Sequence, residues 1–194
     1  MTTSDLAPTA AAVARVIAGV RDEQLTDPTP CTGTSVAAML DHFVGLTVAF
    51  RLGAEKSPQS GGPRADADNL PPDWRERLPQ QLDALVAAWR QPAAWEGVTE
   101  VAGATMPAAA MGVVALNEVL VHGWDLAVAT GQPYDVDPAA AQRCLEFAIE
   151  LAAGAPEVRN GMYGPVVPVR DDDPVMDRLL GQTGRDPGWS PPAA

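Results

Sequence analysis

Three polar side chains interrupt an apolar segment in the second half of the chain. The segment NEVLVHGWDLA, residues 117–127, contains Glu118, His122 and Asp125 among mainly aliphatic neighbours. At about 100° per residue of α-helix, these side chains fall on one narrow stripe whose two ends are apolar. A carboxylate buried on such a stripe is costly unless a partner compensates its charge, and a bound cation would do so. Residues four apart on a helix lie about 5–6 Å apart, so one metal ion can contact both Glu118 and His122.

A third metal ligand has to come from another part of the chain. The sequence has two histidines, and the second one, His42, lies in the apolar segment MLDHFVG. Two imidazoles and one carboxylate with an open position are typical of a catalytic zinc site, although Ni²⁺, Fe²⁺ and Mn²⁺ accept similar ligands. We expect Asp125 either to orient the His122 imidazole or to bind the metal itself. The alternative interpretation is an ordinary ion pair on one helix and a histidine packed in the core.

Apolar residues that recur at helical spacing predict five long helices, which would position these side chains. The second helix carries His42, and the fourth carries the three residues of the stripe. Asp137 followed by Pro138 is a typical start for the fifth helix. Pro79 is expected in the first turn of the third helix, which moves the start of that helix to about residue 78. The predicted helices cover residues 4–20, 35–52, 74–90, 107–130 and 137–153.

The remaining segments are predicted to be mostly irregular. Residues 53–73, rich in Gly, Pro, Ser and Asp, predict a long and partly mobile crossover that could line the mouth of a pocket as a lid. Residues 92–106 predict either one irregular strand or an extended loop. From residue 155 onward we expect mostly extended chain, with one short helix near 174–180. The expected fold class is therefore all-α, as a single domain over 1–194 with a bundle over about 4–154 and a C-terminal wrap over 155–194.

Composition excludes several classes of function. The formal net charge of −12 repels nucleic-acid phosphates, and no basic amphipathic segment is present for anionic lipid. No run of about 18 apolar residues predicts a membrane span, and the N-terminus lacks the positive region of a signal peptide. Cys31 and Cys144 lack CxxC spacing. One disulfide is compatible with the sequence, but a reducing cytoplasm is the simpler interpretation.

Other reactive groups are weaker candidates for chemistry. Cys31 precedes a helix, which can lower the pKa of a thiol, but no histidine remains as its base if both bind metal. We therefore expect Cys31 to be structural and Cys144 to lie in the core. In the C-terminal wrap, Tyr163, Arg159 and Arg170 are candidate substrate contacts with no predicted place relative to the metal.

Longer segments carry a resemblance to a known family. The chain resembles the DinB-like superfamily, in particular its actinobacterial branch around mycothiol-dependent maleylpyruvate isomerase, in PTPCTGTSVAAMLDHFVG, NEVLVHGWDLAVATGQP and GPVVPVRDDDPVMDRLLGQTGRDPGW. The resemblance implies a four-helix bundle with up-down-down-up topology. It also implies a divalent metal, commonly zinc, bound by a histidine of the second helix and a Glu-x-x-x-His pair of a later helix. These positions are His42, Glu118 and His122.

The resemblance also implies a chemistry. In characterised members the metal activates a low-molecular-weight thiol such as mycothiol, whose thiolate isomerises an electrophilic small molecule or is transferred to it. We therefore expect a cytoplasmic, metal-dependent thiol transferase or isomerase, monomeric or homodimeric. The alternatives are a non-catalytic metal-binding regulatory or stress module and a metal-dependent hydrolase. Thr34 stands where the family usually has Trp, and we expect no extra C-terminal domain, so maleylpyruvate isomerisation itself is not expected.

Overall fold

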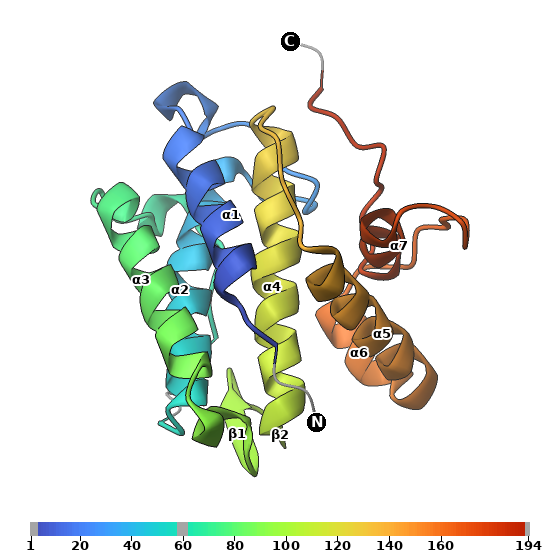
Figure 1. Ribbon diagram of the computed structural model, residues 1–194. Coiled ribbons are helices and arrows are strands. Elements are labelled where there is room, and N and C mark those ends of the chain that lie inside the picture. The colour runs from blue at the N-terminus through green and yellow to red at the C-terminus, as the bar shows by residue number, and fades with distance from the viewer. Residues whose placement is uncertain (1–3, 58–61, 193–194) are drawn as a thin grey trace.

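Helices dominate the computed structural model, which describes residues 4–57 and 62–192 (Figure 1). Within these residues, four long helices form a bundle: α1 (Ala7–Gly19), α2 (Val36–Ala54), α3 (Trp74–Trp89) and α4 (Ala108–Ala129). Helices α1 and α2 each pack against both α3 and α4. Helices α1 and α4 run in one direction and α2 and α3 in the other (Figure 1). The predicted all-α fold is confirmed, and the helix directions match the up-down-down-up topology that the resemblance implied.

Helix α4 lies between the other bundle helices and a C-terminal layer. It packs against α5 (Pro138–Gly154), and α5 in turn packs against α6 (Pro156–Met162) and α7 (Val175–Gln182) (Figure 1). Side chains of α4 are buried on nearly all sides, and Leu116 and Leu120 are fully buried. A polar side chain on α4 therefore has to meet another polar group or line a cavity.

Helix α2 is held at its start by a side-chain cap. Ser35 accepts a hydrogen bond from the backbone N–H of Ala38 at 3.3 Å, which satisfies one of the free donors of the first turn. Phe43 and Leu46 are fully buried against the neighbouring helices. This packing fixes the rotation of α2 and directs His42 toward α4.

The start of α3 corrects the sequence-based expectation. The helix begins at Trp74, and Pro79 lies inside it rather than in its first turn. The additional turn is anchored because Trp74 is buried and the Arg75 guanidinium stacks over its ring, 4.1 Å from the ring centroid. Arg75 also donates to the backbone oxygen of Val20 at 2.7 Å. These contacts offset the backbone hydrogen bond that the proline cannot donate.

Two other segments are more regular than expected. The region predicted as one strand or a loop forms an antiparallel hairpin of β1 (Val98–Val101) and β2 (Ala104–Pro107). Ala102 and Gly103 form its turn, with φ of 54° and 83°. A turn with two positive φ angles usually has the sequence Asn-Gly, and Ala-Gly at this position does not carry that signal. The prediction of extended chain directly after residue 155 is wrong, because α6 begins at Pro156, a residue suited to the first helical turn.

The crossover between α2 and α3 is long because these two helices run in the same direction (Figure 1). It contains a 3₁₀ turn at Ala67–Asn69, and the N–H of Asp66 donates to the carboxylate of Asp41 on α2 at 3.1 Å. Part of the segment predicted as mobile, residues 58–61, lies outside the described residues. Its action as a lid stays a prediction.

Helices α2 and α4 are long and apolar enough to cross a membrane by length and composition alone. Their most apolar windows have mean hydropathies of 1.3 and 1.2, although neither window is a continuous apolar run, because each contains two charged residues. Within the fold, 56% and 78% of these windows are buried, as in the core helices of soluble proteins. Packing in the bundle therefore accounts for their apolar character.

Candidate metal centre

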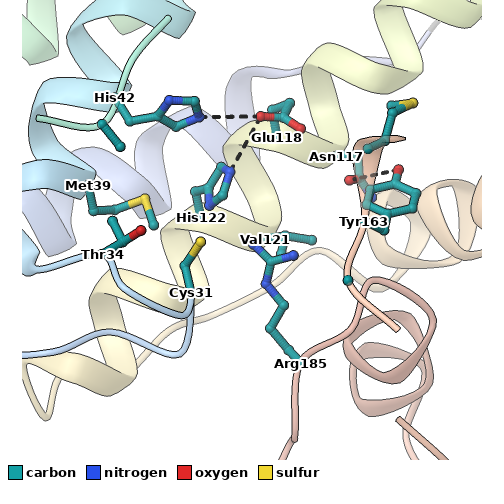
Figure 2. Close-up of a pocket in the computed structure, with 13 residues that line it drawn as sticks. Cys31, Thr34, Met39, His42, Asn117, Glu118, Val121, His122, Tyr163 and Arg185 are labelled. Atoms are coloured by element: carbon teal, nitrogen blue, oxygen red, sulfur yellow. Dashed lines mark hydrogen bonds and ion pairs between the residues drawn. The ribbon is translucent and has the colours of Figure 1, made fainter. Parts of the chain in front are cut away.

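The three predicted metal ligands lie together where α2 meets α4 (Figure 2). Glu118 Oε2 lies 3.6 Å from His42 Nε2 and 3.4 Å from His122 Nε2. The two imidazoles stand edge to face, with ring centroids 4.9 Å apart and planes at 83°. The side chains of His42, His122 and Glu118 are 17%, 11% and 21% exposed. The structure thus brings together one residue of α2 and two of α4 in a largely buried position.

The spacing of these atoms suits a small divalent ion. In a tetrahedral site with bonds of about 2.1 Å, neighbouring ligand atoms are about 3.4 Å apart. The candidate ligand atoms of His42, Glu118 and His122 all lie within 4.8 Å of one another. Two neutral imidazoles and one carboxylate give a charge of −1, so a divalent ion would keep one net positive charge. Such a set fits a divalent metal and favours one further anionic ligand.

In the metal-free protein, Glu118 and His122 stabilise each other's charge. Burial alone would raise the pKa of Glu118, but hydrogen bonds from His122 and His42 hold it well below its usual range. Burial alone would lower the pKa of His122, but hydrogen bonds to Asp125 and Glu118 raise it to about 9. A metal ion that binds His122 Nε2 must displace this proton, so metal binding and protonation compete.

A second row of polar groups lies behind His122. Asp125 is fully buried, and its Oδ2 lies 2.9 Å from His122 Nδ1. Arg185, from the C-terminal segment, donates to the same Oδ2 from Nη2 at 3.1 Å. Burial would raise the pKa of Asp125, but the hydrogen bond from His122 and the charge of Arg185 lower it. Of the two roles predicted for Asp125, the geometry favours orienting the imidazole over binding the metal.

The candidate ligands line a cavity of about 320 Å³, which is at the lower end for small-molecule sites. Three parts of the chain enclose it: the start of α2 with the loop before it, α4, and the C-terminal segment (Figure 2). The crossover contributes Ala65. Thr34, at the position where the resemblance departs from the family, also lines the cavity. Besides the three candidate ligands, Thr34 and Ala65, the lining residues are Cys31, Met39, Asn117, Val121, Met162, Tyr163, Gly164 and Arg185.

The candidate substrate contacts of the C-terminal segment divide into one that reaches the cavity and two that do not. Tyr163 lines the cavity, and its hydroxyl donates to Asn117 Oδ1 at 3.1 Å. Arg159 instead donates to the backbone oxygen of Gln182 at 2.8 Å. Arg170 pairs with Asp172 at the surface. The prediction that Arg159 and Arg170 could reach substrate is therefore not supported by their positions.

Cys144 is fully buried, as expected, whereas Cys31 is partly exposed in the cavity lining. Sequence reasoning missed Arg185, although this residue lies in the third resembling segment. The available signal was indirect: a buried Asp125 requires a cationic partner, but twelve arginines offered no means of choosing among them.

A family model matches the part of the chain that carries the three candidate ligands. The family described as "Mycothiol maleylpyruvate isomerase N-terminal domain" matches residues 6–127, a range that includes His42, Glu118 and His122. Two proteins of Mycobacterium tuberculosis, "Uncharacterized protein MT0763" of strain CDC 1551 / Oshkosh and "Uncharacterized protein Rv0738" of strain H37Rv, are each 31% identical over 175 residues. The alignments cover 84% of this chain and 82% of each relative. No solved structure matches the chain significantly. The chain therefore belongs to the mycothiol maleylpyruvate isomerase N-terminal domain family.

Proposed function

We propose that this protein is a divalent-metal-dependent transferase or isomerase that uses a low-molecular-weight thiol, such as mycothiol, on an electrophilic small molecule. The observation that carries the proposal is the convergence of His42, Glu118 and His122 on the wall of one cavity. Membership of a mycothiol-related family supports the choice of thiol. Zinc is the metal we propose, and Ni²⁺, Fe²⁺ and Mn²⁺ are the alternatives that metal analysis would detect.

His42, Glu118 and His122 would hold the ion, each through one side-chain atom. When bound, the metal would lower the pKa of a coordinated thiol and so supply a thiolate at neutral pH. The net charge of the three side chains supports this role, because a divalent ion and one thiolate would bring the total to zero. A neutral site is the least costly arrangement in a largely buried position.

The rest of the cavity can hold the electrophile beside the thiol. Met39, Val121 and Met162 provide an apolar lining that limits the access of water. Burial raises the pKa of Tyr163, so its hydroxyl stays protonated at neutral pH. The hydroxyl donates its one proton to Asn117 Oδ1, which holds it in place on the cavity wall. Its oxygen is left as an acceptor, so we propose that Tyr163 contacts a hydrogen-bond donor of the substrate.

A thiol-transfer assay tests the proposal. Metal-loaded protein is incubated with mycothiol and, separately, epoxide, halide and activated-alkene acceptors, and adducts or isomerised products are measured by mass spectrometry. We expect thiol-dependent product with at least one acceptor and its loss in Glu118→Gln. Glu146→Gln, an exposed carboxylate on α5, is the matched control and should keep the activity.

The same assay separates the alternatives. Full metal loading without product from any acceptor would favour a non-catalytic metal-binding module. Turnover that needs no thiol would favour a metal-dependent hydrolase. Either result would contradict the thiol-dependent activity while leaving the metal site intact.

A further inference from the structure

Arg185 connects the C-terminal segment to the candidate metal centre. It follows Asp125 by 60 residues and lies outside the range 6–127 that the family matches. Its Nη2 lies 3.1 Å from Asp125 Oδ2, and its Nε lies 3.5 Å from Oδ1. The Arg185 side chain is 11% exposed, and that of Asp125 is fully buried. The two groups thus form a buried, two-point ion pair directly behind His122.

We propose that Arg185 is a positioning residue of the metal centre. Arg185 fixes the Asp125 carboxylate, and that carboxylate in turn orients the His122 ring so that Nε2 faces the ion. The inference rests on the metal site proposed above. An ionised carboxylate only accepts hydrogen bonds, so Asp125 requires the proton of neutral His122 to be on Nδ1. The lone pair of Nε2 is then free on the side where Glu118 and His42 lie. Outer partners of this kind orient metal-binding histidines and tune their affinity.

The backbone around Arg185 leaves little freedom for the guanidinium to move. At the end of α7, the N–H of Arg185 donates to the backbone oxygen of Leu180 at 2.8 Å. Nη1 of Arg185 donates to the backbone oxygen of Thr183, also at 2.8 Å. Both the main chain and the head group of Arg185 are therefore anchored to the C-terminal end of one helix.

Close contact between two glycines sets the direction in which Arg185 leaves α7. Gly184 has φ of 83°, and a Cβ at this position would lie 2.7 Å from Gly164 Cα and 2.8 Å from its carbonyl carbon. Gly164 also lines the cavity. Replacing Gly184 would thus shift Arg185 without altering any polar group of the site. Gly184→Ala therefore perturbs the contact between Arg185 and Asp125 independently of any change to Arg185 itself.

Direct binding of an anionic substrate by Arg185 is the competing role. Three of its donor atoms already contact Asp125 and Thr183, which leaves less of the guanidinium for a ligand. The two roles differ in what they change. A substrate-binding arginine alters substrate affinity and leaves metal binding unchanged, whereas a positioning arginine alters the metal centre before any substrate is present.

The test measures metal binding in the absence of substrate. Zn²⁺ affinity is determined by competition with a chelator, and the coordination geometry is followed by the visible absorption of the Co²⁺-substituted protein. We expect Arg185→Met to weaken Zn²⁺ binding about 10- to 100-fold and to shift the Co²⁺ bands. Arg185→Lys keeps the charge but loses the planar two-point contact, so it should recover part of the affinity. Gly184→Ala should change both readouts in the same direction as Arg185→Met.

A second arginine of the same segment provides the control. Arg170 pairs with Asp172 at the surface, where its side chain is 77% exposed, so Arg170→Met should leave Zn²⁺ affinity and the Co²⁺ spectrum unchanged. Wild-type affinity and spectrum in Arg185→Met would overturn the inference. If Arg185→Met fails to fold, unchanged affinity in both Arg185→Lys and Gly184→Ala would overturn it. Failure of the wild-type protein to bind Zn²⁺ at His122 would remove the proposed function as well, so the two failures are distinguishable.

Discussion

Removing the Asp125 carboxylate should destabilise the metal-free protein strongly. Asp125 is fully buried between His122 and Arg185, whose side chains are each 11% exposed. Asp125→Leu would leave two buried cationic groups without their shared acceptor. Breaking a buried pair in this way costs about 3–5 kcal/mol of unfolding free energy. At about 2–4 °C per kcal/mol for a chain of this size, the melting temperature should fall by about 6–20 °C.

The double variant distinguishes charge pairing from packing. Replacing both partners of a buried ion pair by apolar side chains is often neutral, so Asp125→Leu with Arg185→Met should regain much of the stability lost in Asp125→Leu. Urea unfolding of the metal-free protein at neutral pH measures each free energy. As a control, Arg51→Ala removes an exposed pair with Glu55 and should cost at most about 0.5 kcal/mol. A double variant as unstable as Asp125→Leu alone would refute the reasoning.

Three further predictions concern pH, packing and thiol reactivity. The pKa of His122 is raised from 6.5 to about 9, so its stabilisation of the metal-free protein is complete below pH 6.5 and lost as the pH rises through 9. Urea unfolding midpoints measured as a function of pH should show this loss. An equal loss in His122→Gln would contradict the assignment of the pH dependence to His122. Gly112→Ala places a Cβ in steric conflict with the Trp95 ring and should cost about 1–3 kcal/mol in urea unfolding; a neutral effect would show that the ring can move. Cys31 lines the cavity, whereas burial raises the pKa of the Cys144 thiol to about 12, so brief alkylation of native protein should modify Cys31 first, as peptide mass mapping would show. Equal modification of both thiols would contradict that order.

Much of the fold follows from local sequence patterns. The apolar spacing of α2 and α4, together with the scarcity of histidine, indicated which helices had to meet and which side chains would lie between them. The sequence also placed Asp125 on the same helix face as His122, and it left open whether Asp125 would orient the imidazole or bind the metal. The pattern within one helix therefore sufficed for Glu118, His122 and Asp125.

The remaining features depend on contacts that local patterns do not contain. The first turn of α3 forms because Trp74 is buried under the Arg75 guanidinium and Arg75 donates to Val20 at the end of α1, which overrides the expected effect of Pro79. The hairpin turn places Ala102 at positive φ, where propensity would not put it. The direction in which Arg185 points toward Asp125 depends on the close contact between Gly164 and Gly184. These residues are 20 positions apart in the sequence, so only the folded C-terminal segment reveals their contact.

An anomalous difference map of Zn²⁺-loaded crystals, recorded at the zinc edge, tests the central claim most directly. We expect one strong peak per chain within bonding distance of His42 Nε2, Glu118 Oε2 and His122 Nε2. The peak should disappear in crystals of Glu118→Gln with His122→Gln, while the helices keep their positions. A peak elsewhere, or an unchanged peak in the double variant, would contradict the assignment of these three residues as the metal ligands.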